Sequence, residues 1–243
     1  MMTNPSPCTP PKTRIYAIGD VHGRLDLLDQ LLAQIAADAE TALDVRRVLV
    51  MLGDYVDRGP ESAGVLDRLS DVRDGQVLAG FEVHLLKGNH EDRMLAFLAG
   101  QSEREGATWF ANGGSETLAS YGLDLGTGQD MLRRQLMKVL PRAHKKILRG
   151  LQLCVVLGDY GFVHAGMRPG VTWQHQDPQD LLWIRDDFLN SDEDFGVFVV
   201  HGHAARDAPE VRANRVNIDT RAWASGTLTC LVAQGTQRRF LST

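Results

Sequence analysis

Short apolar segments that end in glycine and polar residues are the feature that most constrains how this chain folds. Such segments recur along the sequence between turn-forming residues, a pattern typical of buried strands. They are RIYAIG from Arg14, RVLVML from Arg47, EVHLLKG from Glu82, LQLCVVL from Leu151, FVHAG from Phe162 and VFVVHG from Val197. The later segments RVNID and TLTCLVA extend the set. The pattern predicts a fold centred on β-sheets.

Amphipathic helical patterns separate the first strands. Apolar residues at positions 28, 31, 32 and 35 form the stripe of one helix, and further helices are expected after Pro60 and after Glu91. The strands after about Leu151 follow one another with little helix between them. We therefore predict an α/β fold with four layers of the α+β type, in which two packed sheets have helices outside them.

The domain organisation is expected to be simple. Residues 13–243 are predicted to form one domain, with a helical insertion at about 100–150 that is interrupted by GLDLGTGQD, and residues 1–12 to form a flexible tail. The first residues, MMTNPSPCTPPK, lack the apolar stretch of a secretory signal, and no apolar run approaches the roughly 20 residues that cross a bilayer. We expect a cytoplasmic protein without a membrane partner.

Composition excludes several other classes. The chain has 243 residues, of which 43% are hydrophobic, and its 31 acidic and 26 basic residues give a net charge of −5. This acidic balance predicts no general nucleic-acid binding. The three cysteines form no CxxC pair, so neither a disulfide framework nor a structural zinc site is indicated. The sequence carries no signal for an oligomeric state.

Polar residues with metal-binding and acid–base chemistry follow these strands. The motifs are GDVHG, with Asp20 and His22; GDYVDRG, with Asp54, Asp57 and Arg58; GNHE, with Asn89 and His90; VHAG, with His164; and HGHA, with His203. In an open α/β sheet, ligands bind at the carboxyl ends of the strands. We expect these side chains to meet at one edge of the fold.

The combination of residue types predicts a site for two divalent metal ions. A carboxylate can bridge two ions about 3.5 to 4 Å apart, and this role suits Asp54. Asp20, His22 and Asp54 are expected to hold the first ion, and Asp54, Asn89, His164 and His203 the second. Mixed oxygen and nitrogen ligands favour manganese, iron or zinc over calcium or magnesium, and we expect manganese.

This series of motifs resembles the phosphoprotein phosphatase branch of the calcineurin-like metallophosphoesterases, over roughly Ile15 to Ala204. The segments WFANGGSETL, LLWIRDDF and NIDTRAWASGTLTCL are similar to those of bacterial members. The resemblance implies a β-sandwich flanked by helices and the metal ligands given above. It also implies that His90, oriented by Asp57, protonates the leaving oxygen, while Arg58 and Arg185 bind the phosphate.

Such residues can hydrolyse a phosphate monoester without a phosphoenzyme. Two metal ions lower the pKa of a bridging water, so that a hydroxide attacks phosphorus directly. An arginine guanidinium group can bind two phosphoryl oxygens at once through two parallel hydrogen bonds. A serine alkoxide is a poor leaving group, so an acid such as His90 is required.

The substrate admits two interpretations. The leading one is a phosphorylated protein, at serine or threonine and possibly tyrosine. The alternative is a small phosphorylated molecule, in the symmetrical hydrolysis of diadenosine tetraphosphate to ADP. Members of that second group look similar but often lack an acidic residue at the position of Asp57, which favours the protein phosphatase. A phosphate-sensing module without catalysis is a third class, but no loss of a ligand or of the acid is visible.

Overall fold

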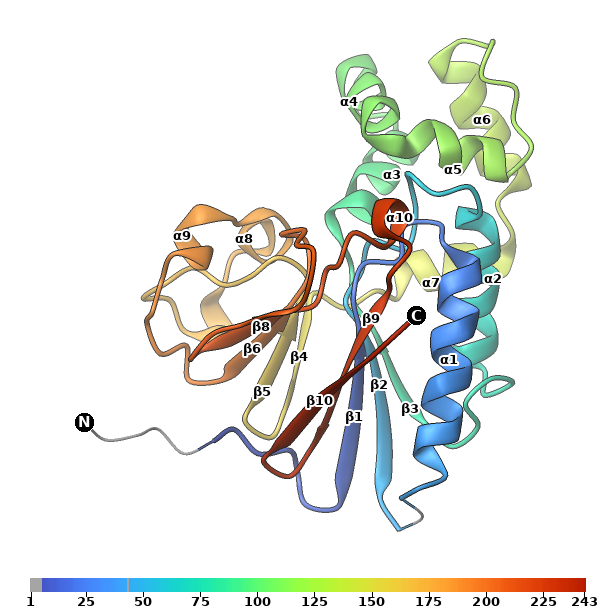
Figure 1. Cartoon of the computed structure of the whole chain (residues 1–243). Coiled ribbons are helices and arrows are strands. Elements are labelled where there is room, and N and C mark those ends of the chain that lie inside the picture. Colours follow the sequence, from blue (N-terminus) through green and yellow to red (C-terminus); the bar gives the residue numbers. More distant parts are fainter. Residues whose placement is uncertain (1–5, 43) are drawn as a thin grey trace.

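The computed structural model describes residues 6–42 and 44–243. Two sheets of five strands each pack face to face in its centre (Figure 1). The first sheet has the order β10-β9-β1-β2-β3, in which β1, β2 and β3 are parallel to one another, β9 is antiparallel to β1, and β10 is antiparallel to β9. Its strands are β1 (Thr13–Ile18), β2 (Arg46–Met51), β3 (Glu82–Leu85), β9 (Thr229–Gln234) and β10 (Gln237–Ser242).

The second sheet has the order β4-β5-β6-β8-β7 and is also mixed. Strands β5, β6 and β8 run parallel, whereas β4 and β7 are antiparallel to their neighbours. The strands are β4 (Cys154–Leu157), β5 (Tyr160–Val163), β6 (Phe198–His201), β7 (Glu210–Val211) and β8 (Arg215–Asn217).

Helices cover the outer faces of both sheets (Figure 1). Helices α1 (Leu25–Ala39), α2 (Ser62–Arg73) and α3 (Asn89–Ala99) belong to the first sheet's side, and α8 (Pro178–Trp183) and α9 (Asp186–Leu189) to the second's. A short helical turn, Trp173–His175, precedes α8, and α10 (Ala222–Ser225) precedes β9. The predicted four-layer arrangement of two mixed sheets and outer helices is confirmed.

The apolar pattern of β1 shows how these layers form. Ile15 and Ala17 lie in the core between the two sheets, whereas Tyr16 and Ile18 lie in the core shared with the helices. Successive side chains of a strand point to opposite faces, and both faces of this strand are covered. An uninterrupted apolar run is therefore what a central strand of this fold needs.

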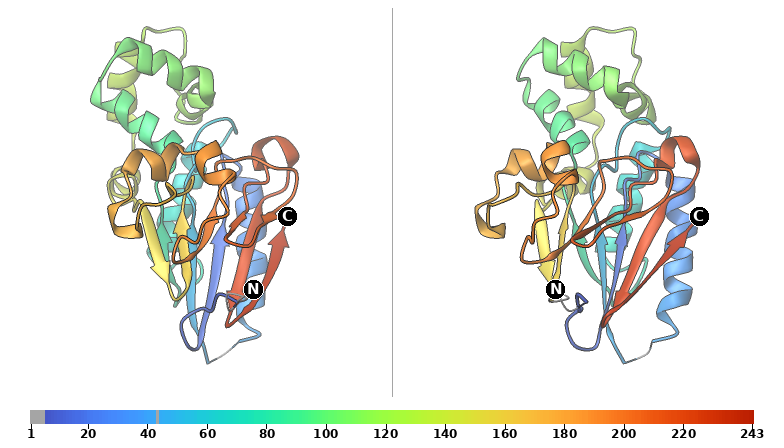
Figure 2. Two further views of the ribbon diagram at one scale, coloured as in Figure 1. Left: turned by 90° about the vertical axis from the view of Figure 1, so that its left-hand side faces the viewer. Right: turned by 60° about the vertical axis from the view of Figure 1, so that its left-hand side comes forward.

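The segment between α3 and β4 is helical. It comprises α4 (Glu103–Trp109), a kinked segment (Phe110–Gly114) in which Asn112 and Gly113 are not helical, α5 (Ser115–Ser120), α6 (Gln129–Val139) and α7 (Arg142–Arg149). Both views in Figure 2 show α4, α5 and α6, in green, standing beyond one end of the sheets. We call residues 100–150 the helical insertion.

Three details differ from the expectations. The helix expected after Glu91 begins earlier, at Asn89, because Gly88 caps it in an extended conformation and the Glu91 side chain accepts the Gly88 N–H. Strands β7 and β10 were not predicted: β7 has two residues, and most of β10 is exposed without apolar alternation.

The structure describes only part of the predicted tail. Residues 1–5 lie outside the described residues, whereas the buried Thr9 donates its backbone N–H to the Gly235 carbonyl. Among the described residues, no helix combines the length and apolar character required to cross a membrane.

Candidate metal centre

The predicted ligands are delivered by both sheets. Asp20 and His22 follow β1, Asp54 follows β2, His164 directly follows β5 and His203 follows β6. Asn89 and His90 instead occupy the first turn of α3, just after β3. All of the predicted metal ligands are buried.

The loops that carry these side chains have unusual backbone conformations. Left-handed φ values occur at His22 (46°), Asp54 (50°), Asp57 (74°), Arg58 (69°) and His203 (61°). Non-glycine residues adopt this conformation at a cost, and it persists where the surroundings enforce it. Here His22 donates its backbone N–H to the Asp54 carbonyl at 2.8 Å, which joins the loops after β1 and β2. Such strain clusters at functional sites.

Asp54 lies at the centre of the cluster. Its Oδ2 is 3.5 Å from His22 Nε2, 3.5 Å from His164 Nε2 and 3.9 Å from His90 Nε2. Two triads of ligand atoms share this carboxylate: His22, Asp54 and His90 in one, and Asp54, His164 and His203 in the other. The placement of Asp54 between two sets of donors fits a carboxylate that contacts two ions.

Unpartnered atoms test whether the residues fit bound cations. Asp20 Oδ1 and His203 Nε2 are both buried and have no hydrogen-bond partner among residues 6–42 and 44–243. Asn89 Oδ1 lies 2.8 Å from His164 Nε2 and 2.9 Å from His203 Nδ1, so the amide oxygen shares the second group. Buried polar atoms without partners are costly unless an ion or water satisfies them. Carboxylate, imidazole and amide donors suit manganese, iron or zinc, and the residues fit such ions.

Two glycines allow the ligands to approach the backbone. A Cβ atom on Gly88 would lie 2.1 Å from Asp54 Oδ1, and one on Gly202 would lie 2.0 Å from Asp20 Oδ1. No larger residue is compatible with these carboxylate positions. The glycines in GNHE and HGHA are thus needed for the site as well as for the turns.

Burial controls the protonation of the imidazoles. It lowers the pKa of His22 to about 3 and that of His203 to about 2. Both rings are therefore neutral near pH 7, which is the form that binds a metal ion.

The carboxylates of the centre repel one another. Burial and the charges of Asp219 and Asp54 raise the pKa of Asp20 well above its usual value. Burial also acts to raise the pKa of Asp54, but the surrounding imidazoles, chiefly His164 and His90, hold it below its usual range. A bound cation would relieve this concentration of negative charge.

Asp57 and His90 form a hydrogen-bonded pair beside the ligands. His90 Nδ1 lies 2.7 Å from Asp57 Oδ2, and both side chains are buried. Burial acts to lower the pKa of His90, yet the carboxylates of Asp54 and Asp57 raise it overall. The pair has the geometry of an oriented acid or base.

The two predicted phosphate-binding arginines are placed differently. Arg58 lies in the cluster, with Nη1 3.0 Å from His22 Nε2 and Nη2 3.2 Å from His90 Nε2. Arg185 is exposed at the start of α9, and its charge contributes to lowering the pKa of His203. The structure brings every predicted metal ligand together with Asp57, His90 and Arg58, and leaves Arg185 at the rim.

Sequence reasoning missed four residues around the centre. Glu91 accepts hydrogen bonds from the backbone N–H groups of Asp54, Tyr55, Val56 and Gly88, and Asp219 is buried beside Asp20. Trp109 and Thr117 donate hydrogen bonds to Asp57. Glu91 and Asp219 stand in motifs that could have revealed them, GNHE and the NIDT segment. Trp109 and Thr117 stand in the segment WFANGGSETL, but nothing in that segment links either residue to Asp57.

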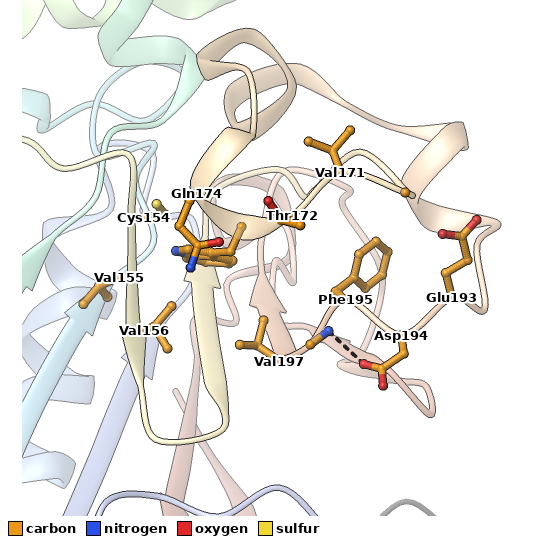
Figure 3. Close-up of a pocket in the computed structure, with 13 residues that line it drawn as sticks. Cys154, Val155, Val156, Val171, Thr172, Gln174, Glu193, Asp194, Phe195 and Val197 are labelled. Atoms are coloured by element: carbon orange, nitrogen blue, oxygen red, sulfur yellow. Dashed lines mark hydrogen bonds between the residues drawn. The ribbon is translucent and has the colours of Figure 1, made fainter.

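A separate hollow of about 770 Å³ lies on the second sheet's side of the molecule (Figure 3). It is lined by β4 residues Cys154, Val155 and Val156 and by loop residues that include Trp173 and Phe195. None of the predicted site residues is among the described residues that line it.

Comparison with known proteins identifies the family to which the chain belongs. The profile of the calcineurin-like phosphoesterase family matches residues 13–224. The chain belongs to this family. It is a metallophosphoesterase, and therefore a metal-dependent phosphoric ester hydrolase of a family that uses binuclear metal centres.

Individual metallophosphoesterases similar to this chain have different names. Serine/threonine-protein phosphatase 2 of Escherichia coli is 29% identical over 227 residues, covering 88% of this chain and 90% of that protein. The asymmetrical bis(5'-nucleosyl)-tetraphosphatase PrpE of Geobacillus thermodenitrificans is 24% identical over 236 residues, covering 89% of each. The solved structure of a cold-active protein-tyrosine phosphatase from Shewanella has a TM-score of 0.56 at 18% identity, covering 96% of this chain and 83% of that one. The last likeness concerns the fold.

Proposed function

We propose that this metallophosphoesterase hydrolyses phosphate monoesters of proteins, at serine or threonine and also at tyrosine, with two manganese ions. The observation that carries the proposal is the buried Asp57–His90 pair at 2.7 Å beside Asp54. A nucleotide leaving group departs without much help, whereas the alkoxide of serine needs a proton. A dedicated, oriented acid is most useful for the poorer leaving group.

Each residue has a proposed task in this reaction. Asp20, His22, Asp54, Asn89, His164 and His203 would hold the ions. When bound, the ions supply charge neutralisation at the phosphoryl group and an acidified water. Arg58 and, from the rim, Arg185 would bind phosphoryl oxygens, and His90 would give its Nε2 proton to the leaving oxygen while Asp57 fixes its Nδ1 tautomer.

Hydrolysis of dinucleoside tetraphosphates is the second candidate. The Geobacillus relative, named as an asymmetrical bis(5'-nucleosyl)-tetraphosphatase and aligned along 89% of this chain, favours it. Trp223 is exposed, and the Arg58 guanidinium lies 5.3 Å from its ring centroid, so an aromatic surface for a base is available beside the site.

A side-by-side measurement separates the two candidates. We would compare kcat/KM for a phosphoserine peptide and for diadenosine tetraphosphate in Mn²⁺, with the Asp54→Asn protein as the blank. A preference for the peptide of tenfold or more, about 1.4 kcal/mol in the transition state, is expected. The opposite preference would overturn the proposal, and the products, ADP alone or ATP with AMP, would tell symmetrical from asymmetrical cleavage.

A further inference from the structure

Two side chains of the helical insertion reach the carboxylate of Asp57. Trp109 Nε1 lies 2.9 Å from Asp57 Oδ2 and 3.1 Å from Oδ1, and Thr117 Oγ1 donates to Oδ1 at 2.6 Å. All three side chains are completely buried. The carboxylate thus has three partners, two from the insertion and the third His90.

The insertion also holds the backbone of this loop. The Asp57 N–H donates to Thr117 Oγ1 at 2.9 Å and to Ser62 Oγ at 3.0 Å, so one hydroxyl bonds both the backbone and the side chain of Asp57. The next residue, Arg58, donates its N–H to the Gly113 carbonyl at 3.1 Å. These contacts enforce the left-handed conformations of Asp57 and Arg58.

Trp109 is itself fixed by close packing. Its ring stacks obliquely on Phe97 with centroids 4.9 Å apart, and a Cβ atom on Gly114 would lie 2.5 Å from the indole. The indole therefore has little room to move, and its N–H has a constant direction. A donor that cannot rotate holds the carboxylate in one orientation.

We infer that Trp109 and Thr117 are positioning residues that make the helical insertion part of the acid machinery at His90. They hold Asp57 so that Oδ2 meets His90 Nδ1, which leaves Nε2 facing the cluster, 3.9 Å from Asp54 Oδ2. Without these donors the buried carboxylate loses hydrogen-bond partners, and we expect it to reorient. The inference rests on the proposed role of His90 as leaving-group acid.

Matched substitutions isolate the two donors. Thr117→Val removes the hydroxyl at nearly constant volume, Thr117→Ser retains it, and Trp109→Phe removes only the indole N–H and one ring. Thr108→Val, at an exposed hydroxyl that bonds the Arg104 carbonyl within the same insertion, is the control for threonine. Trp173→Phe, in the wall of the separate hollow, is the control for tryptophan.

The diagnostic readout is the dependence of kcat on the leaving group. For aryl phosphates of increasing phenol pKa and a phosphoserine peptide, we expect Thr117→Val and Trp109→Phe to lower kcat tenfold or more on the poor leaving groups and less than about twofold on p-nitrophenyl phosphate. Thr117→Ser should restore wild-type behaviour. In an Asp57→Asn background, Thr117→Val should cause no further loss of kcat, because the carboxylate that accepts the Thr117 hydrogen bond is already absent. Equal loss on all substrates, or full additivity, would overturn the inference.

A spectroscopic signature tests the same contacts without turnover. In the protein loaded with diamagnetic Zn²⁺, because Mn²⁺ would broaden the signal, the Nδ1 proton shared by His90 and Asp57 should give a downfield proton resonance, identified by its loss in His90→Asn. We expect it to move or to broaden in Thr117→Val and Trp109→Phe and to stay in both controls; an unchanged resonance contradicts the inference. If the wild type cleaves aryl phosphates but no phosphopeptide, the proposed substrate fails, while the aryl series and the resonance still decide the positioning role.

Discussion

Two buried carboxylates three residues apart, Asp54 and Asp57, have different surroundings. Asp54 Oδ2 faces the imidazoles of His22, His164 and His90, all within 3.9 Å. Asp57 instead bonds one imidazole and two neutral donors. Burial raises the pKa of Asp57 above its usual value, although these hydrogen bonds act against the rise. We propose that this difference assigns one carboxylate to cations and the other to a proton.

Substitution of His90 tests that division of roles. We expect His90→Asn to retain metal binding, because the proposed ligand set is complete without this ring, and to lower kcat on a phosphoserine peptide by about 100-fold. The loss on p-nitrophenyl phosphate, whose leaving group needs no proton, should stay below about tenfold. Metal content by atomic emission and steady-state kinetics provide the measurement. Equal losses on the two substrates, or loss of bound metal, would contradict a leaving-group acid.

The sequence was informative about residues that follow apolar strands. Asp20, His22, Asp54, His164 and His203 each stand one to four residues beyond a strand, so the strand pattern alone was enough to place them near one another. Trp109 and Thr117 could not be found in this way. Their partner, Asp57, is 52 and 60 positions distant in the chain, and only the packing of the insertion brings them together.

The kinked segment Phe110–Gly114 makes a close contact with the loop after β2. Gly113 has φ of 103°, and a Cβ atom there would lie 2.4 Å from the backbone nitrogen of Arg58. This segment is therefore in close backbone contact with the loop. Together with Trp109 of α4 and Thr117 of α5, it joins the insertion to the metal-centre loops.

An alanine at Gly113 is expected to disrupt this contact. Gly113→Ala combines an unfavourable left-handed φ with a backbone clash, and we expect it to lower the free energy of unfolding by about 3 kcal/mol. Gly122→Ala is the matched control, since Gly122 has φ of 73° but open space around its Cβ position; it should cost about 1 kcal/mol. Urea denaturation measures both. Equal decreases in the free energy of unfolding for Gly113→Ala and Gly122→Ala would show that the structure relieves the clash at Gly113 without loss of stability.

Helices and strands with a clear pattern of apolar residues could be predicted from the sequence. Those that form through pairing or capping by other residues could not. The stripe at residues 28, 31, 32 and 35 predicted α1, and the unbroken apolar runs predicted β1 and β2. Strand β10 has mostly exposed side chains and forms because β9 offers a free edge. The start of α3 depends on a capping interaction between Gly88 and Glu91 rather than on apolar spacing.

At the scale of the whole molecule, the metal centre joins the two sheets. Asp20, His22 and Asp54 come from the first sheet, and His164 and His203 come from the second. Further contacts cross the same boundary: the His203 backbone N–H donates to Asp20 Oδ2, and His164 Nδ1 lies 3.0 Å from the Leu52 carbonyl. Any ligand bound here contacts both halves of the fold.

Metal binding is therefore expected to stabilise the entire protein. Ions that bind the folded state alone raise the free energy of unfolding by about 4 kcal/mol at a thousandfold excess over Kd. We expect Mn²⁺ to raise Tm, EDTA to reverse the change, and Asp54→Asn to abolish most of it. Differential scanning calorimetry at several metal concentrations measures the effect. A Tm shift retained in full by Asp54→Asn would contradict its place at the centre of the site.

The spread of the ligands from Asp20 to His203 also has a consequence during synthesis. A nascent chain cannot complete the centre until His203 has left the ribosome, by which time most of the polypeptide has been made. Before that point it exposes only some of the proposed carboxylate and imidazole ligands, without their partners. We therefore expect metal to be acquired late, by chains whose second sheet has already assembled.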